Sequence, residues 1–158
     1  MLEYPDRLIS ALAPHPNPII AVSAPRLRCS HEDFNALEFF VSQLQWLGSS
    51  CVFRVSGMIV GPEYFLESIA PEHGHSVEIF GPRGDSPERR AHCLSKLDEL
   101  PPTALLDAHA LWLFTLPSDL DNTSNVLENS TVILAQEFGV PVFLFLPEPS
   151  GFEVLELV

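Results

Sequence analysis

Five short apolar segments alternate with longer, mixed segments along the chain. Most are nearly continuous in Val, Ile, Leu, Phe or Trp instead of alternating with polar residues. Strands that are buried on both faces have this pattern, and they are typical of parallel sheets covered by helices. We therefore predict five buried strands, at residues 19–23, 51–56, 76–80, 111–115 and 141–146.

The segments between these strands carry the signals of helix ends. Ser30 precedes Asp33 by three residues, as in a capping box, and Gly48 closes the same segment. Prolines mark the beginning or the end of the segments that follow. The pattern predicts four helices between the strands, at residues 30–48, 62–74, 86–100 and 125–139.

The predicted order is β-α-β-α-β-α-β-α-β. With right-handed crossovers, this order gives a three-layer α/β sandwich around a mainly parallel sheet of about five or six strands. Residues 153–158 are the candidate for an additional edge strand. The 158 residues suit one domain, which we place at residues 18–158, after an N-terminal extension, residues 1–17, with a short helix at 4–12.

The charge of the chain limits its partners. There are 8 Lys plus Arg against 21 Asp plus Glu, a formal net charge of −13. Such a charge repels phosphate backbones and anionic lipid head groups, so neither nucleic acid nor a membrane is expected as the main partner. Three widely spaced cysteines, and an N-terminus without the pattern of a secretory signal, predict a cytoplasmic protein with reduced thiols.

The loop after the second strand is the most informative candidate site. In open parallel sheets, ligands bind beyond the carboxyl ends of the strands, where helix N-termini point their free N–H groups. Gly57 and Gly61 permit a tight turn after Ser56 and a close approach of the backbone to a ligand. Glu63 falls in the first turn of the next helix, where its charge suits the helix dipole. A purely structural interpretation, with glycines for the turn and Glu63 for the helix end, stays open.

Two further loops reach the same edge of the predicted sheet. Ser23 and Arg26 follow the first strand, and an arginine there could hold a phosphate with two hydrogen bonds, although a surface ion pair is an equal alternative. The loop after the fourth strand is rich in amides and hydroxyls, which suit either a ribose or phosphate ligand or a solvated turn. Its candidate ligand-binding residues are Asn122, Thr123, Ser124 and Asn125.

Four segments carry a resemblance to a known family. Residues 56–63 read SGMIVGPE, similar to the family's S-G-G-A-R-G-A-D, and residues 72–82 read EHGHSVEIFGP, similar to its ERGIPVEVFPA. LLDAHALWLFT and TVILAQEFGVPVFLFLP look like the family's fourth strand and its final helix and strand. In this order, over about residues 18–147, the chain resembles the SLOG superfamily, which includes the DNA-processing A proteins, lysine-decarboxylase-like proteins and LOG phosphoribohydrolases.

The resemblance implies a Rossmann-like fold with a nucleotide or nucleotide-derived ligand at the strand ends. It also implies hydrolysis of an N-glycosidic bond as the reaction, for which Glu63 or Glu128 would supply the carboxylate. The chain departs from the family at Met58, which stands at a glycine of the family, and at Leu127 with Glu128, which stand at its Gly-Thr.

These departures leave alternatives open. A domain without the glycines could serve as a binding or assembly module, a homodimer formed through Phe39, Phe40 and Trp46 on the first helix. A fainter resemblance is to nucleoside 2-deoxyribosyltransferases, whose glutamate would fall near Thr131, one turn after Glu128.

A metal site is the weakest candidate. His73 and His75, with His92 and Cys93, are possible ligands, but no Cys-x-x-Cys or His-Glu-x-x-His spacing occurs. We therefore predict no metal and no cofactor.

Overall fold

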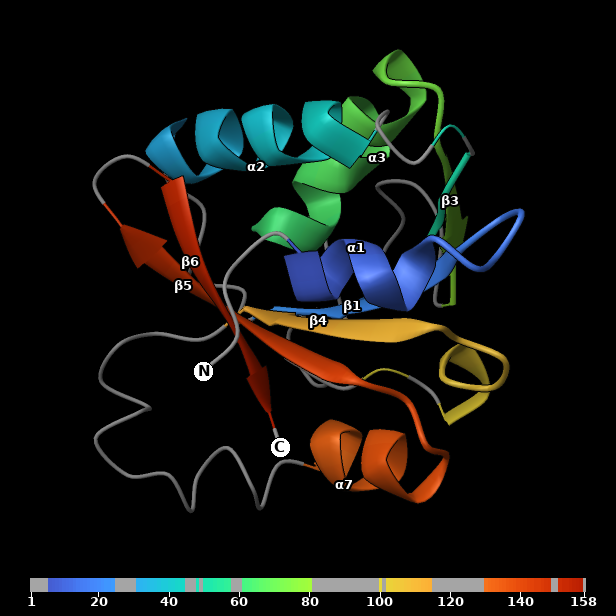
Figure 1. Ribbon diagram of the computed structural model, residues 1–158. Helices are drawn as coiled ribbons and strands as arrows, with labels where there is room; N and C mark the ends of the chain where they lie inside the picture. The colour runs from blue at the N-terminus through green and yellow to red at the C-terminus, as the bar shows by residue number, and fades with distance from the viewer. Residues whose placement is uncertain are drawn as a thin grey trace.

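The fold is built on one sheet of six strands. The computed structural model describes residues 6–24, 31–44, 48, 50–57, 61–80, 100, 102–114, 130–148 and 151–157. Within them the strand order is β3-β2-β1-β4-β5-β6 (Figure 1). The first five strands are parallel, and β6 pairs with β5 in the antiparallel direction. The strands are β1 (Ile19–Ser23), β2 (Val52–Val55), β3 (Ser76–Ile79), β4 (Ala110–Phe114), β5 (Val142–Glu148) and β6 (Gly151–Leu157).

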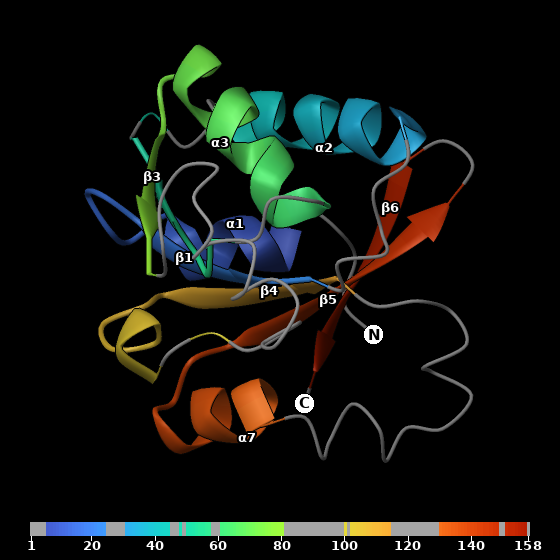
Figure 2. The ribbon, with the colours of Figure 1, turned by 180° about the vertical axis from the view of Figure 1, so that it is seen from behind.

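Helices cover both faces of this sheet, which confirms the predicted three-layer α/β class. Figures 1 and 2 place α1, α2 and α3 on one side and α7 on the other. The described helices are α1 (Asp6–Leu12), α2 (His31–Gln43), α3 (Pro62–Glu72), α7 (Ser130–Glu137) and the short 3-10 helix η2 (Pro102–Ala104). The helix predicted at residues 86–100 lies outside the described residues, as do residues 125–129 of the last one.

Local sequence explains where these helices begin. Two acidic residues, Glu32 and Asp33, lie in the first turn of α2, where they interact favourably with the helix dipole. Pro62 begins α3, where its fixed φ suits the first turn and its missing N–H costs nothing. No described helix has the length and apolar character needed to cross a bilayer.

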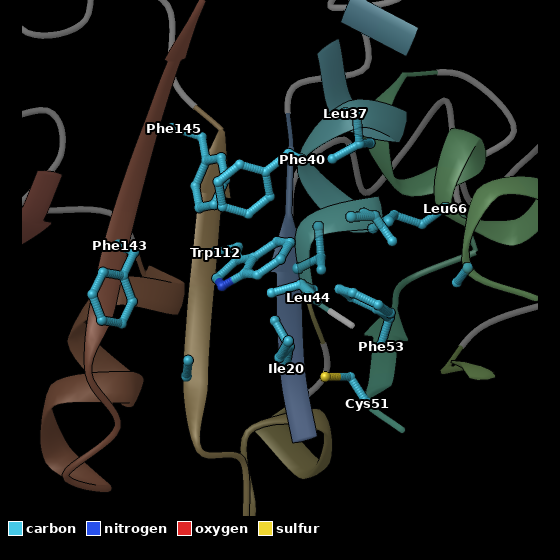
Figure 3. Close-up of a cluster of buried hydrophobic side chains, with 14 of the residues drawn as sticks. Ile20, Leu37, Phe40, Leu44, Cys51, Phe53, Leu66, Trp112, Phe143 and Phe145 are labelled. Carbon is cyan, nitrogen blue, oxygen red and sulfur yellow. The ribbon is translucent and has the colours of Figure 1, made fainter. Parts of the chain in front are cut away.

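An aromatic cluster fills the layer beneath α1, α2 and α3 (Figure 3). Trp112, in β4 beside β1, is fully buried, and its ring centroid lies 5.3 Å from those of Phe40 and Phe53 and 4.8 Å from that of Phe145. Phe40 therefore joins α2 to the sheet. The expectation that Phe40 forms an outer dimer face is wrong, because only 5% of it is exposed. Its neighbour Phe39 is 66% exposed.

The opposite face of the sheet has an aliphatic core. Leu111 and Leu144 pack there with Val132 of α7 and with residues around η2. Arg54 of β2 ties the segment before β4 to the sheet, because its Nη1 donates to the carbonyl oxygens of Ala104 (3.3 Å) and Leu106 (2.6 Å).

Adjacent phenylalanines in α2 provide a test of this packing. Phe40→Ala should lower the free energy of unfolding by about 3–5 kcal/mol, because it removes a buried ring and leaves a cavity beside Trp112. Phe39→Ala should change it by less than about 0.5 kcal/mol, since that ring is mostly in solvent. Urea unfolding followed by tryptophan fluorescence measures both variants. Equal effects of the two would contradict the packing.

Candidate functional site

The order of the strands locates the candidate site. From β1 the chain builds outward to β2 and β3 on one side, and then to β4, β5 and β6 on the other. The direction of building changes between β1 and β4, and in open α/β sheets this point, at the carboxyl ends of the strands, is where ligands bind. Ser23, the last residue of β1, lies in register with Leu113 of β4. Ser23 is buried, with 1% of its surface exposed, so a polar residue ends the central strand inside the protein.

Two glycines with positive φ stand between the neighbouring strand β2 and helix α3, on either side of residues 58–60, which lie outside the described residues. Gly57 has φ 99° and Gly61 has φ 81°, a region that residues with a Cβ rarely adopt. Gly61 is the N-cap of α3, and no side chain caps this helix end. Both the end of β2 and the start of α3 therefore have a backbone conformation that favours glycine.

A buried carboxyl group connects the two ends of this turn. Oε1 of Glu63 accepts hydrogen bonds from the backbone N–H of Ser56 (2.7 Å) and from its Oγ (2.8 Å). Glu63 and Ser56 are each only 1% exposed. Buried hydrogen bonds to a carboxyl group are strong because little water competes for either partner. Glu63 therefore holds the end of β2 against the first turn of α3.

The structure brings several of the predicted site residues together at this edge. Ser23, Ser56 and Gly57 end or follow the adjacent strands β1 and β2, and Gly61 and Glu63 begin the helix after them. The other predicted site residues lie outside the described residues: Arg26, Asn122, Thr123, Ser124, Asn125 and Glu128.

Sequence reasoning treated Glu63 and Ser56 separately and missed their pairing. A signal was available, because a helix with glycine at its N-cap has no capping side chain, and an acid in its first turn is then free to reach the preceding strand. The resemblance to nucleoside 2-deoxyribosyltransferases predicts a nucleophilic glutamate near Thr131. Thr131 is buried in the first turn of α7, and a threonine there provides a hydroxyl and no carboxylate.

Two histidines lie at the opposite, amino edge of the sheet. Nδ1 of His75 accepts the backbone N–H of Cys51 (3.0 Å), and Nδ1 of His109 accepts that of Ile19 (2.9 Å). Each of these N–H groups is at or just before the start of a strand, where the sheet leaves donors without partners. The ring of His15 stacks on that of His109, with centroids 3.5 Å apart.

These contacts give the histidines a structural role. Of the metal ligands considered above, His92 and Cys93 lie outside the described residues, and within the described part no three His, Cys, Asp or Glu side chains are grouped to hold a metal ion. Cys51 is buried, and burial raises the pKa of its thiol to about 11, which keeps it protonated and unreactive.

Comparison with known proteins gives similarity in structure but not in sequence. No protein-family model and no curated protein matches the sequence. Among solved structures, the chain is similar to the molybdenum cofactor carrier protein MCP from Chlamydomonas reinhardtii. The two share 16% sequence identity with a TM-score of 0.50, over 81% of this chain and 76% of the other. At this identity the similarity supports the Rossmann-like fold and nothing finer.

The hydrogen bonds of Glu63 can be tested by removing its side chain and, separately, by replacing its carboxyl group with an amide. Glu63→Ala should lower the free energy of unfolding by about 1–3 kcal/mol, because the buried N–H of Ser56 loses its acceptor. Glu63→Gln should cost less, because the amide oxygen can still accept. Glu72→Ala, at the exposed end of the same helix, is the control, with an expected change below about 0.5 kcal/mol. Chemical denaturation measures all three, and an effect of Glu63→Ala as small as that of the control would contradict the described geometry.

The amino-edge histidines predict a loss of stability in acid. Burial, and then the charge of His73, lowers the pKa of His75 below 6.5, while burial and the charges of His15 and Arg54 lower that of His109. The unfolded chain therefore binds more protons than the folded one just below pH 6.5. The free energy of unfolding should be highest above pH 6.5 and should fall as the pH decreases through this value.

Asparagine provides the matched replacement for these histidines. Its Oδ1 can take the place of Nδ1 as the acceptor but does not titrate, so His75→Asn together with His109→Asn should flatten the profile between pH 7.5 and pH 5.5. His31→Asn, at the exposed start of α2, should leave the slope unchanged. An unaltered slope in the double variant would show that other groups cause the acid sensitivity.

Proposed function

We propose that the carboxyl edge of β1, β2 and β4 binds a nucleotide or a nucleotide-derived small molecule. The observation that carries this proposal is the convergence of the chain's direction change, between β1 and β4, with the glycine turn that follows β2. Sites of this kind supply backbone N–H groups from a helix start, together with short polar side chains, to a phosphate or a ribose.

The residues of this edge have complementary roles in the proposal. Gly57 and Gly61 leave room for the ligand because they have no side chains, and Ser23 lies at the end of the central strand. In the proposal, Arg26 and residues 122–125, which lie outside the described residues, provide the charged and polar contacts to the ligand. An arginine has special value here, since the rest of a chain with net charge −13 repels an anionic ligand.

Glu63 acts mainly as a positioning residue in this proposal. Its Oε1 already accepts two hydrogen bonds from Ser56, so its first effect on a ligand is to fix the end of β2 and the turn beside it. Hydrolysis of an N-glycosidic bond would require a carboxylate at the sugar, and Glu128 is the second candidate for that role.

The similar fold of MCP supports small-molecule binding as the core of the function. That protein is named as a carrier of the molybdenum cofactor, so a chain of this architecture can hold a small molecule as its task. Membership of this chain in the SLOG superfamily is part of the proposal and rests on the sequence segments and on the shared architecture.

A thermal-shift screen tests the proposal. The panel contains the common nucleosides, their 5′-mono- and diphosphates, and the molybdenum cofactor. A nucleotide present at ~100 times its Kd should add about 2.7 kcal/mol of stability and raise Tm by several degrees. Arg26→Ala should abolish this shift. Arg7→Ala, which removes an arginine of α1 that is 3.1 Å from Glu156, is the matched control and should retain it.

The outcomes of this screen separate the parts of the proposal. Stabilisation by nucleotides that survives Arg26→Ala would move the ligand away from this edge, and a screen without any stabilising compound would contradict small-molecule binding. Stabilisation by the molybdenum cofactor alone would contradict the nucleotide class. Chromatography of the same mixtures detects a released base, which Glu63→Gln or Glu128→Gln should suppress if hydrolysis takes place.

A further inference from the structure

The outer side of β6 is a strand edge without a partner among the described residues. β6 spans seven residues, Gly151–Leu157, and forms the end of the sheet, with β5 as its only neighbour there (Figure 1). Beyond this ladder, α2 packs on one face of β6, where Val154 is buried, and Leu155 and Leu157 pack against the aliphatic core on the other face. Arg7 of α1 bonds Glu156. No strand among the described residues pairs with the outward N–H and C=O groups of β6, and such groups can pair with another strand.

Sequence does little to protect this edge. Proteins commonly block an exposed edge with proline, lysine, a bulge or a very short strand. β6 has no proline and no lysine, and its register with β5 is continuous from Leu157 to Gly151. The opposite edge of the sheet, β3, has only four residues. Among the described strands, the sheet therefore ends in one long strand, β6, and one short strand, β3.

The two glutamates of β6 do not prevent it from pairing with a copy of itself. In this arrangement, two copies extend one sheet about a two-fold axis that is perpendicular to the sheet. Residues that lie opposite each other then have their side chains on the same face, so their residue numbers are both even or both odd. Glu153 and Glu156 therefore cannot lie opposite each other. With the axis at Val154, Glu153 lies opposite Leu155 and Glu156 opposite Phe152. With the axis at Leu155, Glu153 lies opposite Leu157 and Glu156 opposite Val154. In both registers each glutamate therefore lies opposite an apolar residue. Like charges directly opposite each other would destabilise the pair, and these registers avoid them.

A nearby arginine also reduces the charge of this edge. Nε of Arg7, in α1, lies 3.1 Å from Oε2 of Glu156. One of the two acids of β6 is therefore partly compensated within each copy. The apolar residues of the strand are Phe152, Val154, Leu155 and Leu157.

We propose that the outer edge of β6 pairs antiparallel with the β6 edge of a second copy of this chain, giving a homodimer with one continuous sheet. The partner is a second copy of the chain, because two β6 strands have the same length and can pair without placing their glutamates opposite each other. The pairing adds main-chain hydrogen bonds, as in β-strand addition, without rearranging either copy. This interface is independent of the proposed ligand site.

Ionic strength gives a first expectation. Each copy has a net charge of −13, so the two repel each other until salt screens the charge. The dimer should therefore be tighter in 0.5 M NaCl than in 0.05 M NaCl, whereas an interface held by ion pairs would show the reverse.

Analytical ultracentrifugation and hydrogen exchange on the full chain test the pairing. The protein should sediment as a dimer at high concentration, and alternate amides of β6 should exchange more slowly there than after dilution into the monomer range. The amides of β3 are the internal control and should not change. A monomer at every concentration and salt level, or a dimer whose β6 amides are unaffected by dilution, would overturn the proposal.

Two substitutions separate this edge from the face of α2. Leu155→Lys, which introduces an edge-blocking residue, should raise the dimer Kd at least tenfold. Phe39→Lys, on the exposed side of α2, should leave it unchanged. The reverse result would place the interface on α2 and contradict pairing through β6.

A cysteine close to the axis provides a second measurement, which is the formation of a bond instead of the loss of one. In a background with Cys29→Ser and Cys93→Ser, Val154→Cys or Leu155→Cys should form an intermolecular disulfide under mild oxidation, because one of the two lies on or next to the axis. Glu156→Cys lies farther from its copy in the expected registers and should cross-link less. Cross-linking at Glu156→Cys but at neither of the others would contradict the proposed register.

Discussion

The central strand β1 must be covered on both faces, and the architecture follows from this requirement. Its residues from Ile20 to Ser23 are all buried, and it pairs with β2 on one side and with β4 on the other. A parallel strand in this position needs helical connections over both faces of the sheet. The chain therefore crosses one face on the way to β2 and β3 and the other face on the way to β5. The change of side creates the edge where Ser23 ends, and so burial of one strand also determines the position of the proposed ligand site.

Sequence patterns predicted the elements of this fold more completely than their contacts. The apolar runs located all five parallel strands to within a few residues, and the candidate edge strand at residues 153–158 is part of β6. The expected burial is wrong for β3, which lies at the edge of the sheet and has only exposed and half-buried residues. Phe40 was a second error. It stands three residues after Leu37 and four before Leu44, which is the spacing of the buried stripe, but the density of apolar residues on this helix suggested a second, outer face.

The site could be predicted only in part, for a physical reason. Positive φ at Gly57 and Gly61 follows from residue type and local position, so a turn was predictable. The bond between Glu63 and Ser56 depends on the three-dimensional approach of a helix start to a strand end, which local patterns do not encode. The histidines at the amino edge are similar, because His75 and Cys51 are 24 residues apart and meet only through the pairing of β2 and β3.

The symmetry of the proposed dimer has a consequence for the candidate site. A two-fold axis normal to the sheet reverses the direction of every strand in the second copy, so the carboxyl edges of the two copies point in opposite directions. The Ser23 and Ser56 edge of one copy therefore cannot meet that of its partner across β6. The two candidate sites are therefore separate in this dimer, and α2 and α3 of both copies remain on the same side of the continuous sheet. Dimer formation would then extend the sheet at β6 and leave the geometry around Glu63 unchanged, since β2 and β6 are separated by β1, β4 and β5.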